Sequence, residues 1–271
     1  MKIIKIIGLF CLFCFTFFYT EKIIDITMEQ DEIMVKIKEE ENNLNINPIN
    51  AIIENDTIIP GNTGKDIDIE ASYKSMKKIG YYDQSLITYQ KVYPEISIYN
   101  NYNLYIIKGN TQNKSVSIIY ILNNDKTLNT ITDSINKYNI NINFFIDSTY
   151  LYNNINLIDT LSNNEIYNYG SNGKYTKDNL IITNNIINNK SNNKSIYCLF
   201  LNKEESSHNN CANNKMFSLY IDKFATLNYV KNNLSNGSLF LINNTQELNN
   251  IIEYILSKGY KIVPLSSLIT E

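Results

Sequence analysis

The stretch GSLFLINNTQELNNIIEYILSKGYKIVPLSSLI, residues 237–269, carries the clearest folding pattern of the chain. Residues 237–244 form an apolar run bounded by glycine and asparagine, which is typical of a buried strand. Residues 245–259 have apolar side chains at helical spacing and end in a glycine, which predicts a helix that stops there. Residues 260–269 then predict a last strand and a turn. Strand, helix and strand in this order indicate a parallel α/β unit.

The same alternation of short β-prone runs and helical stretches begins at about residue 114. The predicted strands cover residues 116–122, 142–147, 165–170, 195–200 and 217–221. The predicted helices cover residues 127–138, 151–161 and 178–188. This order predicts a parallel-sheet α/β domain or barrel over residues 111–271. Its length of roughly 160 residues is short for a complete eight-fold barrel.

Residues 21–110 follow a different pattern and are predicted to form a strand-rich accessory region. In DEIMVKIKEEE, the side chains of Ile33, Val35 and Ile37 alternate with Met34, Lys36 and Lys38, which favours a strand over a helix. Residues 48–64 predict extended segments joined by a turn. Residues 66–80 switch to helical spacing, and a glycine at position 80 is suited to end that helix.

The first 20 residues are predicted to be a membrane anchor or a signal segment. An apolar run extends from Ile6 to Tyr19, close to the lower limit of about 17 residues for crossing a bilayer. Lys2 and Lys5 would keep the N-terminus in the cytoplasm. No small-residue cleavage site follows, so we favour an uncleaved single-pass anchor over a cleaved signal peptide or a lipoprotein. The expected location is the cell membrane, with the C-terminal domain extracytoplasmic.

The distribution of cysteines agrees with export. Cys11 and Cys14 lie in the apolar run, so Cys198 and Cys211 are the pair left in the exported part. Two cysteines in an oxidising compartment predict a disulfide, which would stabilise the fold by about 3 kcal/mol on the chain-entropy model. The alternatives are two free thiols or a metal site that includes His208. No further cysteine or histidine lies at ligand spacing, which disfavours the metal site.

Composition excludes several classes of function. The net charge is −3 and the lysines are scattered without a basic patch, so no nucleic-acid partner is expected. His208 is the one histidine in the chain, and there is no arginine. A catalytic zinc site usually needs two or three histidines, and a Ser-His-Asp triad could be built only around His208. The chain therefore lacks the residues of most common hydrolases.

Two short sequence motifs add a family resemblance to this pattern. They are Phe144-Phe145 in INFFID, which is followed by a helix and by NNEIYNYG, and Lys258-Gly259-Tyr260 near the C-terminus. Their order and spacing resemble the polysaccharide deacetylases, the NodB-type carbohydrate esterases. The resemblance covers about residues 114–271. It implies a distorted (β/α) barrel of about seven strands and hydrolysis of an N-acetyl amide at a bound metal.

The resemblance also implies where the chemistry of that family should lie in this chain. The two family aspartates, a base and a metal ligand, fall on Ile121 and Leu122. The two metal-binding histidines fall on Tyr169 and Gly173, and the late histidine that acts as an acid falls on Asn243. None of these side chains can replace the family's metal ligands or its proton donor. We therefore expect no metal cofactor and a catalytically inactive homologue.

Other polar residues near predicted strand ends are weaker candidates for chemistry. The carboxylates are Asp125, Asp147, Glu165 and Asp222, and such residues more often form turns or cap helices. Ser171 in YGSNG is predicted to lie in a turn. His208, with Ser206 and Ser207 beside it, is expected on an exposed loop.

Tyr120, Tyr169 and Tyr197 are predicted to gather with Asn243 at the former catalytic cleft. Tyrosine rings can stack on sugars and amide side chains can bond hydroxyl groups, although the rings could instead simply fill the space of the lost metal site. The preferred hypothesis is a membrane-anchored, extracytoplasmic deacetylase-like pseudoenzyme that binds cell-wall glycan or a surface protein. The alternatives are an active polysaccharide or peptidoglycan N-deacetylase that holds a divalent metal such as zinc with divergent ligands, and a purely structural surface protein without a cleft.

Overall fold

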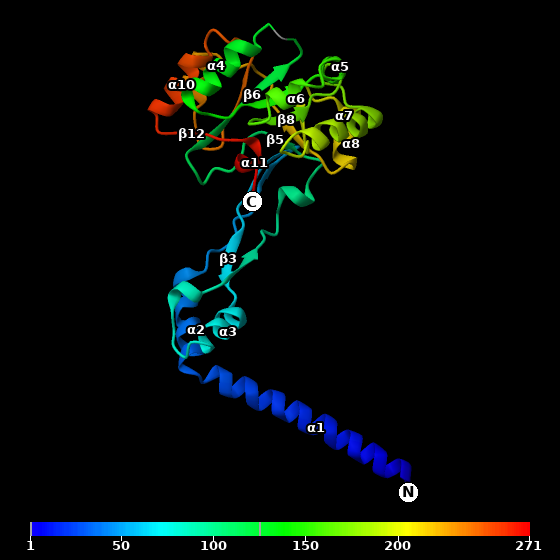
Figure 1. The fold of residues 1–271 in the computed structure, drawn as a ribbon, viewed down its shortest axis with the longest axis vertical. Coiled ribbons are helices and arrows are strands. Elements are labelled where there is room, and N and C mark those ends of the chain that lie inside the picture. The colour runs from blue at the N-terminus through cyan, green and yellow to red at the C-terminus, as the bar shows by residue number, and fades with distance from the viewer. Residues whose placement is uncertain (1, 125) are drawn as a thin grey trace. The chain divides into compact units, whose positions relative to one another are not determined.

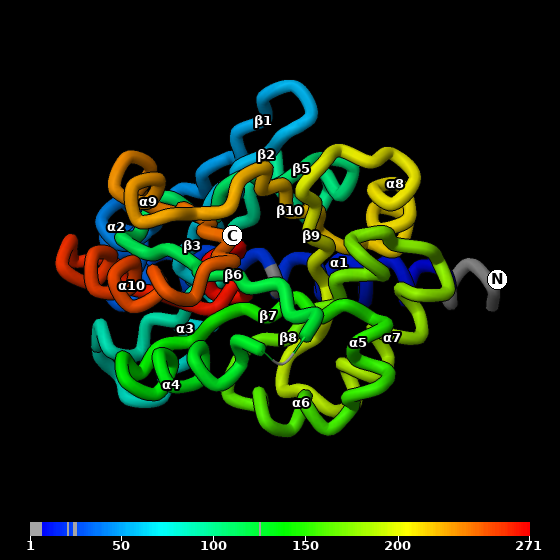
Figure 2. Tube along the Cα trace, turned by 90° about the horizontal axis from the view of Figure 1, so that it is seen from above, coloured from blue at the N-terminus to red at the C-terminus, as the bar shows by residue number. Residues whose placement is uncertain are grey.

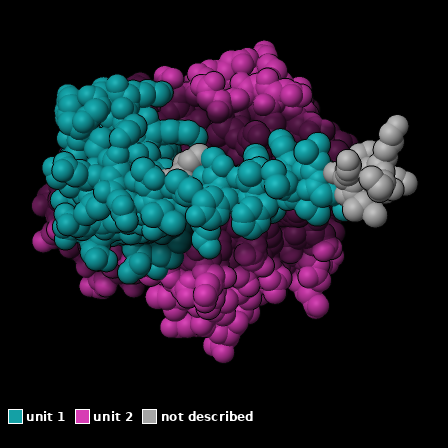
Figure 3. Space-filling model, turned by 90° about the horizontal axis from the view of Figure 1, so that it is seen from below, with its two compact units in different colours: residues 1–48, 63–92 teal, residues 49–62, 93–271 magenta. Residues whose placement is uncertain are grey.

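The structure is a computed structural model that describes residues 2–124 and 126–271, without the side chains of residues 2–6, 21, 24 and 25. It contains two compact units, which Figure 3 colours separately. One unit comprises residues 1–48 and 63–92, and the larger one comprises residues 49–62 and 93–271. Residues 49–62 and 93–110, which we assigned to an accessory region, thus belong to the larger unit.

The smaller unit combines helices with a two-stranded antiparallel sheet. Its elements are α1 (Lys2–Glu29), α2 (Glu32–Leu44), β3 (Gly64–Ile67), α3 (Ile69–Lys77), a 3-10 turn (Gln84–Leu86) and β4 (Tyr89–Val92). Strands β3 and β4 pair with each other. Among the residues with described side chains, no helix is long and apolar enough to cross a membrane, so the predicted transmembrane helix is not found there. The predicted orientation of that helix depended on Lys2 and Lys5, whose side chains are not among those described.

The strand predicted over residues 33–38 is wrong, because this segment belongs to helix α2. Ile33 and Ile37 are four residues apart, a spacing that places both on one helix face as well as on one strand face. Both are buried, whereas Val35, which a strand would bury beside them, is 42 % exposed. Asp31 caps the helix by accepting a hydrogen bond from the Ile33 amide at 3.0 Å. The region before the α/β domain is therefore not predominantly strand.

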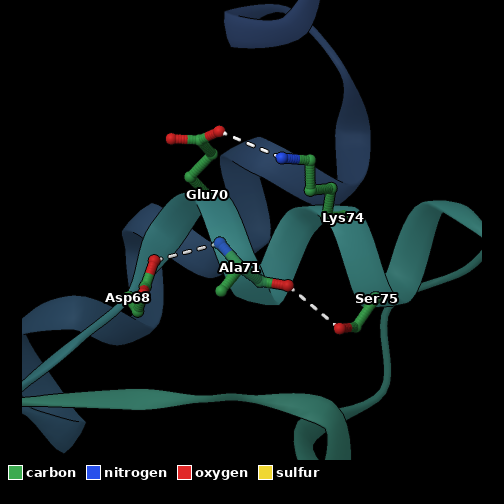
Figure 4. A network of polar contacts seen from close by, with 5 residues as sticks. All are labelled: Asp68, Glu70, Ala71, Lys74 and Ser75. Atoms are coloured by element: carbon green, nitrogen blue, oxygen red, sulfur yellow. Dashed lines mark hydrogen bonds and ion pairs between the residues drawn. The ribbon is translucent and has the colours of Figure 1, made fainter.

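The helix predicted over residues 66–80 is confirmed as α3, and Figure 4 shows the polar contacts along it. Asp68 caps its first turn by accepting from the Ala71 amide at 3.0 Å. Glu70 and Lys74 form an ion pair of 3.4 Å one turn apart, and the Ser75 hydroxyl donates to the Ala71 carbonyl at 3.0 Å. Gly80 follows with a φ of +82°, a left-handed conformation that glycine adopts without strain.

The larger unit is an α/β domain built on two sheets. One sheet has the order β11-β6-β7-β8, with β12 also paired to β6, and all of these pairs are parallel. Its strands are β6 (Ser115–Leu122), β7 (Asn143–Ile146), β8 (Glu165–Asn168), β11 (Leu239–Ile242) and β12 (Lys261–Ile262). The other sheet has the order β1-β2-β5-β10-β9. Its strands are β1 (Ile52–Glu54), β2 (Thr57–Ile59), β5 (Tyr105–Ile106), β9 (Tyr197–Phe200) and β10 (Phe217–Tyr220).

Helices connect these strands, as the alternation in the sequence predicts, and Figure 1 labels most of them. They are α4 (Leu128–Tyr138), α5 (Ser148–Asn153), α6 (Leu157–Thr160), α7 (Lys177–Lys190), α8 (Glu205–Asn213), α9 (Leu227–Asn233), α10 (Leu248–Ser257) and α11 (Leu265–Leu268), with a 3-10 turn at Ile98–Asn100. Helices α4 to α10 lie outside the strands (Figure 2). No strand ladder joins β8 to β9 within the described residues, so closure of the expected seven-stranded barrel is not shown.

Strand β6 is the centre of the core, because helices or strands cover both of its faces. Ile118 and Leu122 are fully buried in a cluster that includes residues of α4 and α10. Ile119, on the opposite face, is buried in a second cluster with Phe145 and Leu241. Burial on both faces is typical of parallel strands and explains the continuous apolar run from residue 116 to 122.

The predicted disulfide between Cys198 and Cys211 is present. It joins β9 to α8, and both cysteines are fully buried in a small cluster with Phe200 and Met216. Helix α8 was expected to be a loop because Asn and Ser dominate its sequence. The disulfide and the cap at its N-terminus, where the Glu204 carboxylate accepts from the amides of residues 206 and 207, supply the stabilisation that helix propensity lacks.

A candidate ligand cleft without metal ligands

Two adjacent hollows lie where β6, β8, β9 and β11 end, the edge at which α/β proteins place their sites. The larger hollow has a volume of about 470 Å³ and is lined by Tyr120, Ile121, Asn123, Asn124, Lys126, Thr127, Tyr169, Asn172, Leu201, Phe224, Ile242 and Asn243. The smaller has a volume of about 250 Å³ and is lined by Tyr169, Asn172, Gly173, Lys174, Leu199, Phe200, Leu201, Asn202 and Glu204. We call these two hollows together the cleft.

At the end of β6, one of the two predicted residues lines the cleft and the other does not. Ile121 lines it, but Leu122 is fully buried in the core on the opposite side of the strand. Asn123 and Asn124, the next two residues, line the cleft and are exposed. Leu122, which the resemblance placed among the family's catalytic positions, therefore does not face the cleft, whereas Ile121 does.

Tyr169 stands at the position expected for a metal-binding histidine, one residue beyond the end of β8. Its ring is 9 % exposed and packs in the inner core cluster. Its hydroxyl lies beside Gly173, where a Cβ would be 3.0 Å from the phenol oxygen. Gly173 has a φ of +76°, so a side chain there would be strained as well as crowded. Burial raises the pKa of Tyr169, with a smaller contribution from the Asp147 carboxylate, so the phenol stays protonated at neutral pH.

Amide side chains dominate the polar surface of the cleft. Asn172, Asn202 and Asn243 are exposed, and their side-chain amides have no hydrogen-bond partner among the described residues. At the end of β6, the Asn124 amide donates to the Asn123 side-chain oxygen at 2.7 Å. Of these asparagines, only Asn243 could be predicted from the sequence, because an asparagine in an asparagine-rich chain carries no signal of its own.

Of the three tyrosines that we expected at the cleft, Tyr120 and Tyr169 line it and Tyr197 does not. Tyr197 begins β9 and so lies at the opposite end of that strand from the cleft. It is 1 % exposed, and its hydroxyl donates to the Ile269 carbonyl at 3.4 Å, so the ring of Tyr197 is a packing element. At the cleft, the Tyr120 hydroxyl is hydrogen-bonded to the Thr127 hydroxyl at 2.6 Å.

The carboxylates proposed as weaker candidates have structural roles where they are described. Asp147 accepts hydrogen bonds from the backbone amides of Thr149, Tyr150 and Asn172, so it caps α5 and holds the turn after β8. Glu165 lies at the start of β8 and accepts from the Tyr167 hydroxyl and from the amide and hydroxyl of Ser266.

The remaining candidates are Asp222, Asp125 and Ser171. Asp222 is exposed and lines neither hollow of the cleft, and Asp125 lies outside the described residues. Ser171 pairs with Lys174 across a tight turn, as predicted.

His208 lies on α8 rather than on an exposed loop, which corrects the prediction. Its ring stacks on Tyr105 with 4.0 Å between centroids, and its buried Nε2 has no hydrogen-bond partner in the described part of the chain. Burial lowers its pKa, against a smaller opposite effect of Asp56. The Ser207 hydroxyl accepts from the Tyr175 amide at 3.0 Å. Since no carboxylate of the described residues is bonded to the imidazole, this arrangement is not a catalytic triad.

The cleft residues that the structure describes do not fit a catalytic metal. Zinc and similar ions in hydrolases are held by histidine, cysteine and carboxylate side chains. At the cleft, Asn123, Asn124 and Tyr169 offer neutral amides and a protonated phenol instead, and Gly173 has no side chain. Within residues 2–124 and 126–271, no group of three or more His, Cys, Asp or Glu side chains has an arrangement that could hold an ion.

Comparison with known proteins gives few sequence matches. No family model matches the chain. The uncharacterized protein YlxY of Bacillus subtilis (strain 168) is 24 % identical over 161 residues, which is 56 % of this chain and 50 % of YlxY. The chain thus matches about half the length of that relative.

Solved structures give a stronger likeness, at the level of the fold. A CE4 family pseudoenzyme from Bacillus anthracis is 22 % identical, with a TM-score of 0.62, over 89 % of this chain and 96 % of that one. A mutant of that pseudoenzyme with restored enzymatic activity has the same TM-score and is 21 % identical over 89 % and 99 % of the two chains. The peptidoglycan N-acetylglucosamine deacetylase Bc1960 is 17 % identical, with a TM-score of 0.52, over 61 % of this chain and 92 % of that one.

These likenesses confirm the predicted resemblance. The chain has the fold of the CE4 polysaccharide deacetylases, a fold shared by active deacetylases and by a pseudoenzyme.

Proposed function

We propose that this protein is a catalytically inactive relative of the CE4 deacetylases that binds neutral glycan in its cleft. One observation carries the proposal. The cleft lies where an α/β enzyme of this fold keeps its site, and amides, a phenol and a glycine line it in place of metal ligands. Because neutral amides can neither replace a carboxylate base nor bind zinc tightly, the cleft retains the means to bind a ligand and lacks those to hydrolyse it.

The chemistry of the cleft supports a sugar as the ligand. An asparagine side chain offers two donors and an acceptor, which match hydroxyl and acetamido groups. The partly exposed ring of Phe224 supplies an apolar face beside these amides. The disulfide supports a location outside the cytoplasm, since such bonds persist in oxidising compartments. We propose the cell surface as the place of action, and attachment to a membrane there stays a prediction.

Two assays on the full-length protein test the proposal. After incubation with zinc or cobalt and desalting, we expect less than roughly 0.1 equivalent of bound metal and no acetate released from acetylated chitooligosaccharides or peptidoglycan. An active CE4 deacetylase serves as the positive control. We also expect the protein to sediment with insoluble chitin or peptidoglycan, and an Asn243→Ala variant to do so less than the matched surface variant Asn209→Ala.

Each possible outcome decides between the hypotheses. One tightly bound equivalent of metal together with acetate release would establish the active deacetylase with divergent ligands. Absence of both activity and sedimentation would overturn the glycan-binding proposal and favour a protein partner or a structural role.

A further inference from the structure

Four lysines that are far apart in the sequence come together where α9 and α10 end and where β6 and β12 begin. They are Lys114, Lys231, Lys258 and Lys261, and we call them the lysine patch. The ammonium groups of Lys231 and Lys258 lie over the same ring, that of Tyr254, at 5.8 and 5.3 Å from its centroid. The neighbouring helices α9 and α10 thus contribute one half of the patch.

A second set of contacts places Lys114 and Lys261 beside that pair. The Lys114 ammonium donates to the Lys258 carbonyl at 3.3 Å and lies 5.3 Å from the centroid of the Tyr260 ring. The Lys261 amide donates to the Lys114 carbonyl at 2.9 Å, because β12 pairs with β6 there. The contacts therefore join the four lysines into a row, from α9 across the end of α10 to the starts of β6 and β12.

The positive charge of the lysine patch is not balanced by carboxylates in the described part of the chain. All four side chains are exposed, and none of them forms an ion pair there. Glu253, the carboxylate of α10, is paired with Lys137 instead. The C-terminal ends of helices attract lysines, which accounts for the two at α9 and α10 but not for the two beside β6 and β12. The patch therefore has the charge of an anion-binding surface.

The surroundings of the lysine patch indicate which kind of anion it fits. Lysine ammonium groups lie over the rings of Tyr254 and Tyr260, and both rings are partly buried against the core, so neither is free to stack on a nucleic-acid base. Leu256, an exposed apolar residue of α10, is two positions from Tyr254 and so lies on another face of the helix. The patch thus offers charge without the apolar side chains that insert into a lipid surface.

We infer that the lysine patch binds a linear polymer of phosphate groups. A row of unpaired ammonium groups matches the repeated charges of such a polymer, and each contact releases a counterion, so the affinity must fall steeply with salt. The patch lies at the starts of β6 and β12, whereas the cleft lies where β6 ends. This second site goes beyond the proposed glycan binding and does not rest on it.

The test is titration of the full-length protein with inorganic polyphosphate in 50 and 200 mM salt, followed by calorimetry. With a salt exponent of about 0.7 for each lysine, the wild-type protein should bind about 50-fold more weakly in the higher salt. The triple variant Lys231→Gln/Lys258→Gln/Lys261→Gln keeps one lysine of the row, so its affinity should change only about threefold. Lys261→Gln alone breaks no side-chain contact of the described residues and should show about a 20-fold change.

A matched control separates the patch from the net charge of the protein. The triple variant Lys177→Gln/Lys194→Gln/Lys215→Gln removes the same charge from exposed positions elsewhere in the larger unit, so it should keep the 50-fold dependence. Melting curves followed by circular dichroism show whether both triple variants fold. The patch variant should still sediment with chitin, because its substitutions lie away from the cleft.

Three outcomes would overturn the inference and leave glycan binding untouched. The first is absence of polyphosphate binding by the wild-type protein in 50 mM salt. The second is an equal loss of salt dependence in the control variant. The third is a lysine-dependent preference for phosphatidylglycerol over phosphatidylcholine vesicles without polyphosphate binding, which would identify a lipid surface as the ligand; helix α1 is the same in both proteins and cannot produce that difference. Loss of chitin sedimentation in the wild type would instead concern the proposed function alone.

Discussion

A carboxylate introduced at Leu122 should strongly destabilise the larger unit, whereas the same carboxylate at Asn123 should be tolerated. Leu122 is fully buried in the core, while Asn123 is exposed at the cleft. The Asn123 side-chain oxygen already accepts a hydrogen bond from Asn124, and an aspartate there would keep this bond. The pair of variants Leu122→Asp and Asn123→Asp therefore tests which residues at the end of β6 face the cleft.

The magnitude at Leu122 follows from its burial. Removing a fully buried leucine side chain costs about 1.5–3 kcal/mol of transfer free energy, and an unpaired buried carboxyl group adds about 1–3 kcal/mol. We therefore expect a loss of about 4 kcal/mol. For a unit of this size, each kcal/mol shifts the melting temperature by about 2–4 °C, so the shift should be roughly 10 °C. At the exposed position 123, the change should stay within about 0.5 kcal/mol.

Thermal and urea unfolding followed by circular dichroism measure both effects. Ile121→Asp, at a partly buried residue that lines the cleft, should fall between the other two variants. The reasoning would be refuted by a Leu122→Asp protein within about 1 kcal/mol of the wild type, or by an Asn123→Asp protein destabilised as much as Leu122→Asp.

Three further predictions concern the stability of the larger unit. Replacing both Cys198 and Cys211 by alanine should lower the free energy of unfolding by about 3 kcal/mol. Dithiothreitol should leave the urea midpoint of this double variant unchanged, because it has no disulfide to reduce. A double variant with the same urea midpoint as the wild type would contradict this prediction. Asp147→Ala leaves three backbone amides without their acceptor, so it should lower the free energy of unfolding in urea by about 2 kcal/mol. The control Asp159→Ala breaks an exposed ion pair and should change that free energy little. Burial lowers the pKa of His208, so its imidazole binds a proton more readily in the unfolded chain than in the folded one. The melting temperature should therefore fall as the pH drops below about 6.5. If His208→Phe shows the same decrease between pH 7.5 and 5.5, the imidazole is not responsible.

The parallel α/β domain could be predicted because its strands are buried on both faces. Residues 116–122 and 237–244 read as continuous apolar runs for this reason, and the helix at residues 245–259 has a complete apolar face. The pairing of Cys198 with Cys211 could be predicted by elimination, since the other cysteines lie in the N-terminal apolar run.

The errors have physical causes that a single sequence does not reveal. Ile33 and Ile37 fit the spacing of a strand and of a helix equally well. A strand would place Met34 on the opposite face from them, so its burial on the same side indicates a helix, but this burial is seen only in the structure. Leu122 was wrongly expected at the cleft because strand alternation alone does not say which face of β6 meets the cleft. The disulfide stabilises α8 in spite of its weak helix propensity, an effect outside the local sequence.

The strand order implies that this domain folds late. Strand β6 lies near the start of the domain, yet β11 and β12, two of its partners, come from residues 239–262 at the far end of the chain. While the polypeptide is synthesised from its N-terminus, this edge of β6 stays unpaired until residues 239–262 have emerged, and such non-local pairing is slow to form. The sheet can therefore be completed only after all the helices and strands between β6 and β11 have been made.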